Sequence, residues 1–527
     1  MQFILSLTLL LSTGTSGVTP LRWMSPDSSK PLTHAEWRAA LRPRPWRVST
    51  LMVPCKLDSP RVDFFVQETL VSSLQQSLDT LVADLGRETT GVAVFSVSGT
   101  SAESLKALLT AEYHTGMTSA VLVGDLPIAW FQLIDDWNDN GVRDNGEGYE
   151  EFPCDLFFMD LDGTWKDSLA RLADTLDSLV PGSDSVYDVH EGSITPEISV
   201  SRLPASEIGN AESLLVNYFD KNHRYRSHQL AVTDRALVYI DDDWTPWATD
   251  WDSNVGLLYH DRVLVSDSEQ TRILDYQPRI DSAAYQWIAL MSHSWPGGHA
   301  MYYDHKDSMD WFYATSIPSL DPHACFYDLF ACSNVRFVES GYCGGRYVFQ
   351  TSDGLSAIGS TKTGSMLNFG DFYSPLGQGV SLAEAFRQWF DAQLRDGCSP
   401  SERSWFYGMC LVADGTLRPR LPQTGIAEER RDMTEMSDIS DRVPSLHLLT
   451  NPVRGQLNLN VSLRSPASCR VALFDLTGRV AVQLAPQAYR AGSHRLSLDA
   501  SALPAGVYFI SVSAGNSSAR VPITVVR

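Results

Sequence analysis

Two apolar runs near the middle of the chain each end at a reactive side chain. The run WIALMS (287–292) precedes His293, and the run FYDLFA (326–331) precedes Cys332. Short, continuous apolar runs are typical of strands that are buried on both faces of a parallel sheet. Because chemistry in such sheets lies beyond the carboxyl ends of the strands, we expect His293 and Cys332 to face one crevice.

Short apolar strands and helical apolar spacing alternate along most of the chain. The first block has the order helix 67–86, strand 92–97, helix 101–114 and strand 119–126. A second block with the same alternation runs from ALVYIDDDW (236–244) to GLSAIGST (354–361). Strands that alternate with helices predict an α/β fold with a parallel sheet. We predict two α/β subdomains. The first spans residues 56–228, and the second, which would be the catalytic one, spans residues 229–420.

The last part of the chain has a different pattern. Residues 421–444 are polar and charged without an apolar period, which is typical of a linker. Residues 445–527 alternate apolar and polar positions over short stretches such as QLNLNVSL and GVYFISVS, with turns between them. Short strands at this spacing predict a small β-sandwich.

The first residues have the pattern of an export signal. Residues 1–17 combine an apolar stretch with small residues at cleavage-like positions, although they lack Lys and Arg. A buried N-terminal helix is the alternative. Residues 18–55 form an N-terminal lead or pro-segment that would block the crevice until it is cleaved. No later stretch is long and apolar enough to predict a transmembrane segment after the signal peptide.

Composition narrows the possible functions. The chain has 527 residues, of which 43% are hydrophobic, and a formal net charge of -22. This length exceeds what one core usually organises, so several domains are expected. Its acidity would repel phosphate backbones, so we expect no nucleic-acid partner. The eight cysteines are too few for a disulfide scaffold, and the sequence does not assign their pairs.

The paired thiol and imidazole point to a cysteine hydrolase. An imidazole that takes the thiol proton produces a thiolate able to attack carbonyl carbon. The alternative is that Cys332 is inert core and His293 is satisfied structurally. The order of the two residues and their position just past apolar runs favour catalysis.

A third group would fix the orientation of the histidine. The turn after the predicted strand at 236–240 offers three consecutive carboxylates, Asp241, Asp242 and Asp243. In hydrolase triads an acid holds the imidazole in the productive tautomer. A solvated acidic turn is the alternative for any one of the three.

A second motif predicts a calcium site. The segment DWNDNGVRDNGE (136–147) matches a calcium-binding loop, with Gly141 at the tight turn. Its predicted ligands are oxygen atoms of Asp136, Asn138, Asn140, Val142, Asp144 and Glu147, the Val142 oxygen being a backbone carbonyl. The flanking residues do not have the pattern of two EF-hand helices, and a polar surface turn is the alternative. Asp160 and Asp162 nearby are weaker candidates. No zinc-ligand spacing or phosphate-binding glycine loop occurs, so no organic cofactor is expected.

These features together resemble the gingipain-type family of cysteine peptidases, which has a caspase-like fold. One apolar run ends at His293, and a later one ends in Ala-Cys at Cys332, as in that family. The resemblance covers about residues 60–420. Further family-like stretches are VLVGDLPIA, DLFFMDLDGTW, PEISVSRLPA and GMCLVADGTLRP. The family usually has Gly where this chain has Ser294.

The resemblance implies roles for further residues. By similarity to arginine-cleaving members, Asp243 is the best match for the third catalytic residue. The backbone amides of Ser294 and Cys332 would form the oxyanion hole. A preference for basic side chains would use a pocket carboxylate, for which Asp250 and Asp252 are the candidates.

The C-terminal residues 445–527 resemble the type A sorting domain of type IX secretion, an Ig-like sandwich found in certain diderm bacteria. NPVRGQLNLNVSL, VALFDLTGRVAVQL and LPAGVYFISVSAG contain the resemblance, with Asp475, Gly478 and Gly506 in family order. A carbohydrate-binding or stabilising sandwich is the alternative. The resemblance implies a secreted or cell-surface protein whose partners are the type IX secretion machinery and protein or peptide substrates.

Two functions follow from the sequence. The first is a secreted, calcium-stabilised cysteine endopeptidase that acts through Cys332 and His293, oriented by Asp243. The second is a catalytically silent binding or adhesion protein on a peptidase scaffold. Loss of Cys332 or His293 would favour the second, and both are present.

Overall fold

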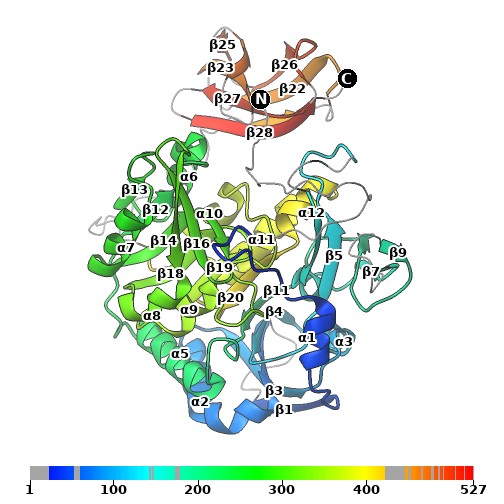
Figure 1. The fold of residues 1–527 in the computed structure, drawn as a ribbon, viewed down its shortest axis with the longest axis vertical. Helices are drawn as coiled ribbons and strands as arrows, with labels where there is room; N and C mark the ends of the chain where they lie inside the picture. Colours follow the sequence, from blue (N-terminus) through cyan, green and yellow to red (C-terminus); the bar gives the residue numbers. More distant parts are fainter. Residues whose placement is uncertain are drawn as a thin grey trace. The chain divides into compact units, whose positions relative to one another are not determined.

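The apolar runs of the peptidase-like region join into one large sheet. Within the described residues this sheet has eleven strands in the order β1-β3-β2-β4-β11-β20-β19-β18-β14-β12-β13. Their bounds are β1 Arg47–Met52, β2 Arg61–Gln67, β3 Gly91–Ser98, β4 Met117–Val123, β11 Ser199–Leu203, β12 Ala236–Ile240, β13 Arg262–Val265, β14 Tyr285–Met291, β18 Ala324–Phe330, β19 Ser356–Ser360 and β20 Met409–Ala413. The prediction of an α/β fold is therefore confirmed (Figure 1).

The computed structural model describes most, but not all, of the chain. It covers residues 23–52, 60–141, 144, 147–171, 179–421, 445–448, 453–463, 467–475, 480–484, 487–490, 492–504, 506–514 and 517–525. The chain divides into two units, residues 1–422 and 423–527. The predicted signal peptide, most of the predicted linker and Val142 lie outside the described residues.

The direction of the strands divides the large sheet into two parallel blocks. The strands β2, β3, β4, β11 and β20 are parallel to one another, and so are β19, β18, β14, β12 and β13. The two blocks meet where β19 pairs antiparallel with β20, and β1 adds an antiparallel edge to the first block. The strands of both predicted subdomains thus share one sheet.

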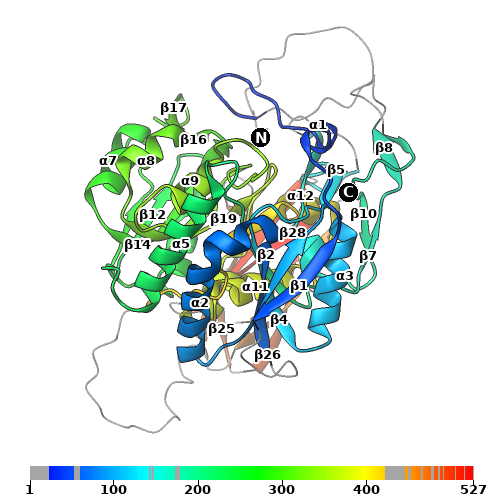
Figure 2. The same cartoon turned by 90° about the horizontal axis from the view of Figure 1, so that it is seen from below.

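Helices cover the faces of this sheet. They are α1 His34–Ala40, α2 Val71–Arg87, α3 Ala102–Tyr113, α4 Leu156–Met159, α5 Ala211–Arg226, α6 Ala248–Val255, α7 Ile273–Ser282, α8 Ile317–Leu320, α9 Cys343–Phe349, α10 Gly370–Gly377, α11 Leu382–Leu394 and α12 Pro400–Phe406. Helices α2 and α5 pack side by side (Figures 1 and 2). Helix α11 begins after Ser381, whose hydroxyl accepts the backbone N–H of Glu384 and so caps the helix.

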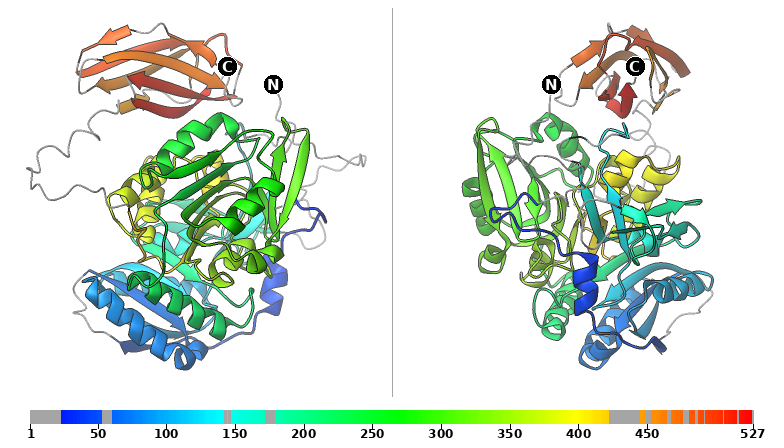
Figure 3. Two further views of the ribbon diagram at one scale, coloured as in Figure 1. Left: turned by 90° about the vertical axis from the view of Figure 1, so that its left-hand side faces the viewer. Right: turned by 45° about the vertical axis from the view of Figure 1, so that its right-hand side comes forward.

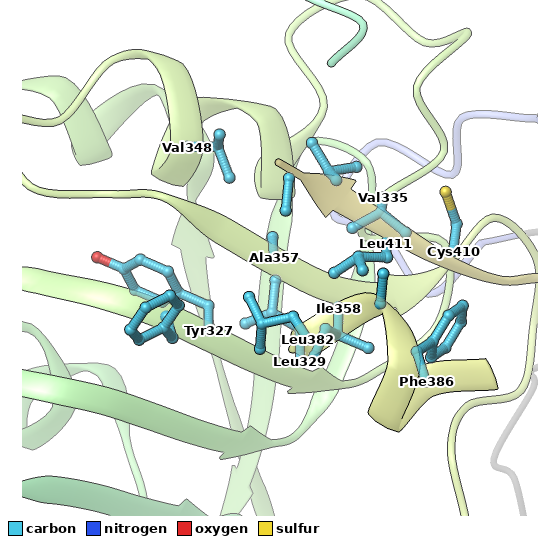
Figure 4. Close-up of a cluster of buried hydrophobic side chains, with 14 of the residues drawn as sticks. Tyr327, Leu329, Val335, Val348, Ala357, Ile358, Leu382, Phe386, Cys410 and Leu411 are labelled. Atoms are coloured by element: carbon cyan, nitrogen blue, oxygen red, sulfur yellow. The ribbon is translucent and has the colours of Figure 1, made fainter. Parts of the chain in front are cut away.

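The core around the second block is continuous from sheet to helices. Strands β18, β19 and β20 contribute Leu329, Ile358 and Leu411, all at most 1% exposed. Val348 of α9 and Phe386 of α11 belong to the same cluster (Figure 4). Such burial makes the ends of β18 and β19 a rigid base for side chains beyond them.

Smaller sheets lie beside the large one. The pairs are β5 Trp130–Ile134 with β6 Tyr149–Pro153, β7 Thr164–Lys166 with β10 Val189–Glu191, and β8 Leu169–Arg171 with β9 Leu179–Pro181. A further sheet follows β14 directly and consists of β15 His293–Trp295, β16 Gly298–Tyr303 and β17 Ser308–Tyr313. Figure 2 shows β16 and β17 near α7 and α8.

The second unit consists of strands only in its described residues. One sheet contains β21 Ser445–Leu448, β22 Gln456–Leu463 and β26 Gly492–Asp499, and another contains β23 Ala467–Asp475, β24 Val480–Gln483, β25 Gln487–Tyr489, β27 Gly506–Ala514 and β28 Ser517–Val525. Alternate residues such as Leu457, Leu459 and Val461 are buried between them. This agrees with the predicted sandwich (Figure 3).

Candidate active site

The carboxyl ends of four neighbouring strands meet at one edge of the large sheet. Strands β12, β14, β18 and β19 are adjacent and parallel. His293 and Cys332 each lie two residues beyond the last paired position of β14 and β18. Asp243 follows β12 and Gly364 follows β19. The sheet therefore brings Asp243, His293, Cys332 and Gly364 to one edge, in that spatial order.

The three consecutive aspartates have three different surroundings. Asp241 is fully buried and accepts backbone N–H groups of its own turn and of β16. Asp242 accepts the Ser268 hydroxyl at 2.8 Å. Only the Asp243 carboxylate bonds the candidate base, with 2.8 Å between its Oδ2 and His293 Nε2. Among the three candidates, Asp243 is therefore the one placed to orient the imidazole.

The charges around His293 favour its protonated form. Burial lowers the pKa of His293, but the hydrogen bond to Asp243 and the charges of Asp241 and Asp243 outweigh it, so that the pKa is raised. Burial also opposes ionisation of Asp243, yet the bonds to His293 and Lys306 lower its pKa to about 2. The Lys306 ammonium lies 2.7 Å from the second oxygen of this carboxylate. The imidazole therefore faces a carboxylate that is ionised throughout the neutral range.

The Cys332 thiol is half-buried at the end of β18. Burial raises its pKa to about 11, although the backbone N–H of Gly364 and the charge of Lys362 act in the opposite direction. Gly364 has a φ of 113°, and a Cβ there would meet the Ser404 carbonyl oxygen at 2.6 Å. Only glycine fits this turn without strain, so the residue that directs an amide at the thiol is fixed by backbone sterics.

Ser294, which stands where glycine was expected, connects the two reactive loops. It is 2% exposed, and its hydroxyl donates to the backbone carbonyl oxygen of Cys332 at 2.5 Å. Its backbone belongs to β15, opposite His299 in β16. The serine side chain thus ties the histidine strand to the cysteine loop.

A buried ion cluster supports the loop that contains Gly364. The Lys362 ammonium is fully buried and lies 2.9 Å from both Asp135 Oδ1 and Glu150 Oε2. Glu150 also accepts the backbone N–H and hydroxyl of Thr363. These two carboxylates outweigh burial and raise the pKa of Lys362. A buried ion cluster of this kind fixes backbone geometry, because losing one partner leaves an uncompensated charge.

Sequence patterns did not reveal Lys306, Lys362 or Gly364. Each arrives from a turn with irregular backbone, where neither a helical nor a strand period exists to place it. The only signal was the glycine itself in STKTG (360–364).

The candidate specificity residues lie on α6. The Asp252 carboxylate forms two hydrogen bonds of 2.8 Å with the guanidinium of Arg262 on β13. Asp250 is exposed in the first turn of the same helix. A basic substrate side chain would therefore have to compete with Arg262 at Asp252.

The predicted calcium loop has its side chains drawn together. Asp144 Oδ2 accepts the amide groups of Asn138 and Asn140 at 2.7 and 2.8 Å. Asp136 accepts the backbone N–H of Gly141 at 3.0 Å. Glu147 accepts the backbone N–H groups of two other loop residues. The oxygen donors suit calcium, and the two asparagine side chains would present their oxygens instead of their amides.

A separate acidic cluster lies outside the predicted calcium loop. Carboxylate oxygens of Asp160, Asp162 and Glu197 lie within 4.8 Å of one another. Asp160 also bonds the buried imidazole of His190 at 2.7 Å.

The seven cysteines of the described residues are free thiols, so the structure pairs none of them. In the described part, no helix is long and apolar enough to cross a membrane.

Comparison with protein families assigns most of the chain. The model of peptidase family C25 matches residues 72–420. The model of a secretion system C-terminal sorting domain matches residues 450–525. The first match contains His293, Cys332 and Asp243 together with the predicted calcium loop. No curated protein matches the chain.

Three solved structures are distantly similar to the chain. Dimeric latent PorU from Porphyromonas gingivalis has 11% identity and a TM-score of 0.31, over 89% of this chain and 43% of PorU. PorZ from the same organism, described as an essential surface component of its type IX secretion system, has 18% identity and a TM-score of 0.12, over 24% of this chain and 14% of PorZ. The CARDB domain of a Pyrococcus furiosus protein has 14% identity and a TM-score of 0.13, over 18% of this chain and 100% of that domain. The chain thus spans less than half of PorU or PorZ.

Proposed function

This chain belongs to peptidase family C25, a family of cysteine peptidases, and from this premise we propose that it is a secreted endopeptidase with Cys332 as nucleophile, His293 as base and Asp243 as orienting acid. The main support is the 2.8 Å bond between His293 and Asp243 at the strand ends that also present Cys332. An acid–imidazole–thiol order of this kind meets the requirement for nucleophilic catalysis.

The reaction would begin with a neutral thiol. Burial holds the pKa of Cys332 at about 11, so its proton would move to His293 Nδ1 as the sulfur attacks the substrate carbonyl carbon. The other ring nitrogen, Nε2, is occupied by Asp243. Asp243 stabilises the imidazolium that forms, because its own pKa is about 2 and it stays ionised.

The bond changes then follow the acyl-transfer pattern. The backbone amides of Ser294 and Cys332 would hold the oxyanion of the tetrahedral intermediate. The imidazolium gives its proton to the leaving amine, and the C–N bond breaks to leave a thioester on Cys332. His293 next takes a proton from the water that attacks the thioester; the C–S bond breaks to release the carboxylic acid product, and the imidazolium returns its proton to the Cys332 sulfur.

The primary side-chain preference is proposed to be basic, through Asp250 or Asp252. Asp250 is exposed on α6, whereas the Asp252 carboxylate pairs with Arg262. An Asp250→Asn variant that loses only cleavage after Arg or Lys would support this role. An unmodified protein that cleaves without any preference for Arg or Lys would contradict it.

The loop at 136–147 is proposed to bind calcium. Its support is the chemistry of the donors, which are carboxylate and amide oxygens gathered by hydrogen bonds around Asp144. Asp135, directly before the loop, bonds the buried Lys362 whose neighbouring turn faces Cys332. Calcium at 1 mM should raise the unfolding temperature relative to chelator, and Glu147→Gln should remove most of that rise. Equal unfolding temperatures in both conditions would overturn the site.

The C-terminal module gives the location. A sorting domain of a secretion system at residues 450–525 means that the protein is secreted or lies on the cell surface. We propose that the type IX machinery recognises this module and that the natural substrates are extracellular proteins or peptides.

The deciding experiment is digestion of a diverse peptide library by the reduced protein in calcium, beside a Cys332→Ala variant. Cleavage that disappears in the variant supports an endopeptidase and reports its side-chain preference. If neither protein cleaves, even after removal of residues 18–55, the catalytically silent binding protein becomes the better description.

A further inference from the structure

The turn between β16 and β17 has an unusual backbone. Asp304, His305 and Lys306 are consecutive non-glycine residues with φ values of 56°, 57° and 70°. The left-handed region is unfavourable for each of them because the Cβ approaches the backbone. Several strained residues in succession persist only where the surrounding contacts fix them, and such strain often lies at functional sites.

Those contacts come from the segments that follow β12 and β13. Asp242 Oδ2 accepts the backbone N–H of Lys306 at 2.6 Å and the hydroxyl of Ser268 at 2.8 Å. The Ser268 hydroxyl accepts the backbone N–H of His305 at 2.6 Å, and its carbonyl accepts that of Asp304 at 2.8 Å. The residue next to the orienting acid therefore holds the strained turn in place.

The consequence is that one carboxylate serves two cations. Lys306 Nζ lies 2.7 Å from Asp243 Oδ1, while His293 Nε2 lies 2.8 Å from Asp243 Oδ2. The Lys306 side chain is 51% exposed and that of Asp243 is 27% exposed.

We propose that Lys306 is a positioning residue that sets the basicity of His293 through their shared carboxylate, Asp243. The inference rests on the proposed function of His293 as a base. The positive charge of Lys306 opposes the negative charge of Asp243, so the imidazolium is stabilised less than it would be by Asp243 alone. The result is a histidine that gives up its proton at a lower pH.

Every charged or titratable group around His293 enters this balance. Asp243 and the buried Asp241 face it from the end of β12, the Tyr302 ring lies against it from β16, and Cys332 follows the next strand. Burial lowers the pKa of His293, the two aspartates raise it, and Lys306 lowers it. Removing the ammonium leaves the raising influences in place, so the pKa of His293 should increase.

The test is a direct titration of the imidazole. The His293 signal is followed by NMR from pH 5 to 9 in Cys332→Ala protein, and it is assigned by its absence in His293→Gln. Adding Lys306→Met should raise the His293 pKa by about half a pH unit, the effect of one half-exposed charge at short range. Lys306→Arg, which keeps the charge, should titrate like the parent. All three residues have a Cβ, so the backbone strain is the same.

The matched control is Lys166, which is also 51% exposed and paired with a carboxylate, that of Glu191 on β10. Lys166→Met should leave the His293 titration unchanged. The shift in the His293 pKa caused by Lys306→Met should shrink in 1 M salt, because the Debye length is then only about 3 Å and dissolved ions screen the charges. Equal His293 pKa values with and without Lys306 would overturn the inference, as would an equal shift in Lys306→Arg.

This readout separates the inference from the proposed function. The titration needs no substrate, so it works even if no peptide is cleaved, in which case the proposed function fails while the role of Lys306 is still measured. If the protein cleaves peptides, Lys306→Met should move the acidic limb of the pH profile of kcat/KM to higher pH, by the same amount as the pKa shift seen by NMR. Hydrolysis with an unmoved limb would leave the function standing and reject the role of Lys306.

Discussion

The hairpin formed by β15 and β16 contains two histidines, and only one has the surroundings of a base. His299 on β16 lies six residues after His293, and its Nε2 is 3.3 Å from the Sγ of Cys343 at the start of α9. Both residues of this second pair are fully buried. Burial lowers the pKa of His299 to about 3 and raises that of Cys343.

The difference lies in the carboxylate and in access. His293 bonds Asp243 and keeps a raised pKa, whereas burial alone sets the pKa of His299. Among the described residues, His299 Nδ1 has no hydrogen-bond partner. A short contact between sulfur and imidazole is therefore not evidence of catalysis. A charged partner for the imidazole and a half-exposed thiol are the features that distinguish a reactive pair from a packed one.

The largest expected effect is the contrast between the two thiols in activity. Cys332→Ala should reduce kcat/KM by at least about 1,000-fold, because the nucleophile is lost. Cys343→Ala should stay within about twofold of the parent, because nothing in its surroundings can transfer a proton to substrate. Both are measured on one peptide selected from the library digest. Comparable losses in the two variants would break the comparison.

The next effect tests the carboxylate. Asp243→Asn should lower kcat by about 100- to 10,000-fold, because the amide does not stabilise the imidazolium and favours the wrong tautomer. The pKa of His293 should fall, which makes its surroundings resemble those of His299. Asp353→Asn is the matched control, because Asp353 bonds the exposed His323 at 2.8 Å in another surface pair. An Asp243→Asn enzyme as active as this control would show that the acid is dispensable.

How far the sequence predicts this site depends on the backbone around each residue. The ends of β14 and β18 are regular, so the apolar runs alone predicted that His293 and Cys332 would share an edge. The turn at 241–243 is irregular, and no strand or helix period distinguishes its three aspartates. Asp241 and Asp242 accept hydrogen bonds from backbone N–H groups. In the sequence, an aspartate in this structural role cannot be distinguished from a catalytic one.

Long-range contacts set the remaining part of the site. Lys306 reaches Asp243 from a turn 63 residues away in the chain, and Lys362, beyond the end of β19, reaches Asp135, which follows β5 of a separate small sheet. Such pairs depend on the sheet order, which single-sequence periodicity does not contain. The α/β class and the C-terminal sandwich were predictable because alternation and strand length report local structure directly.

A smaller effect is expected in chemical labelling. Iodoacetamide at pH 8 should alkylate Cys332 at least about 100-fold faster than Cys343. Cys343 is fully buried, so its reaction needs a local opening of the structure that costs at least roughly 3 kcal/mol. The rates are read from the two cysteine-containing peptides by mass spectrometry. Prior denaturation should equalise them. A folded protein that labels both thiols at one rate would mean that Cys343 is accessible.

The smallest effect concerns what the buried pair does for stability. Cys343→Ser places a hydroxyl next to His299 Nε2. This nitrogen can accept a hydrogen bond from the hydroxyl, so the new polar group is not left unpaired. Cys325→Ser is the matched variant on β18, where the thiol is 3% exposed and surrounded by the apolar core. We expect Cys325→Ser to be more destabilising by about 1 kcal/mol, measured from urea unfolding midpoints with a common slope. Equal midpoints would mean that the imidazole does not accept a hydrogen bond at 343, and the thiol–imidazole contact would then be packing alone.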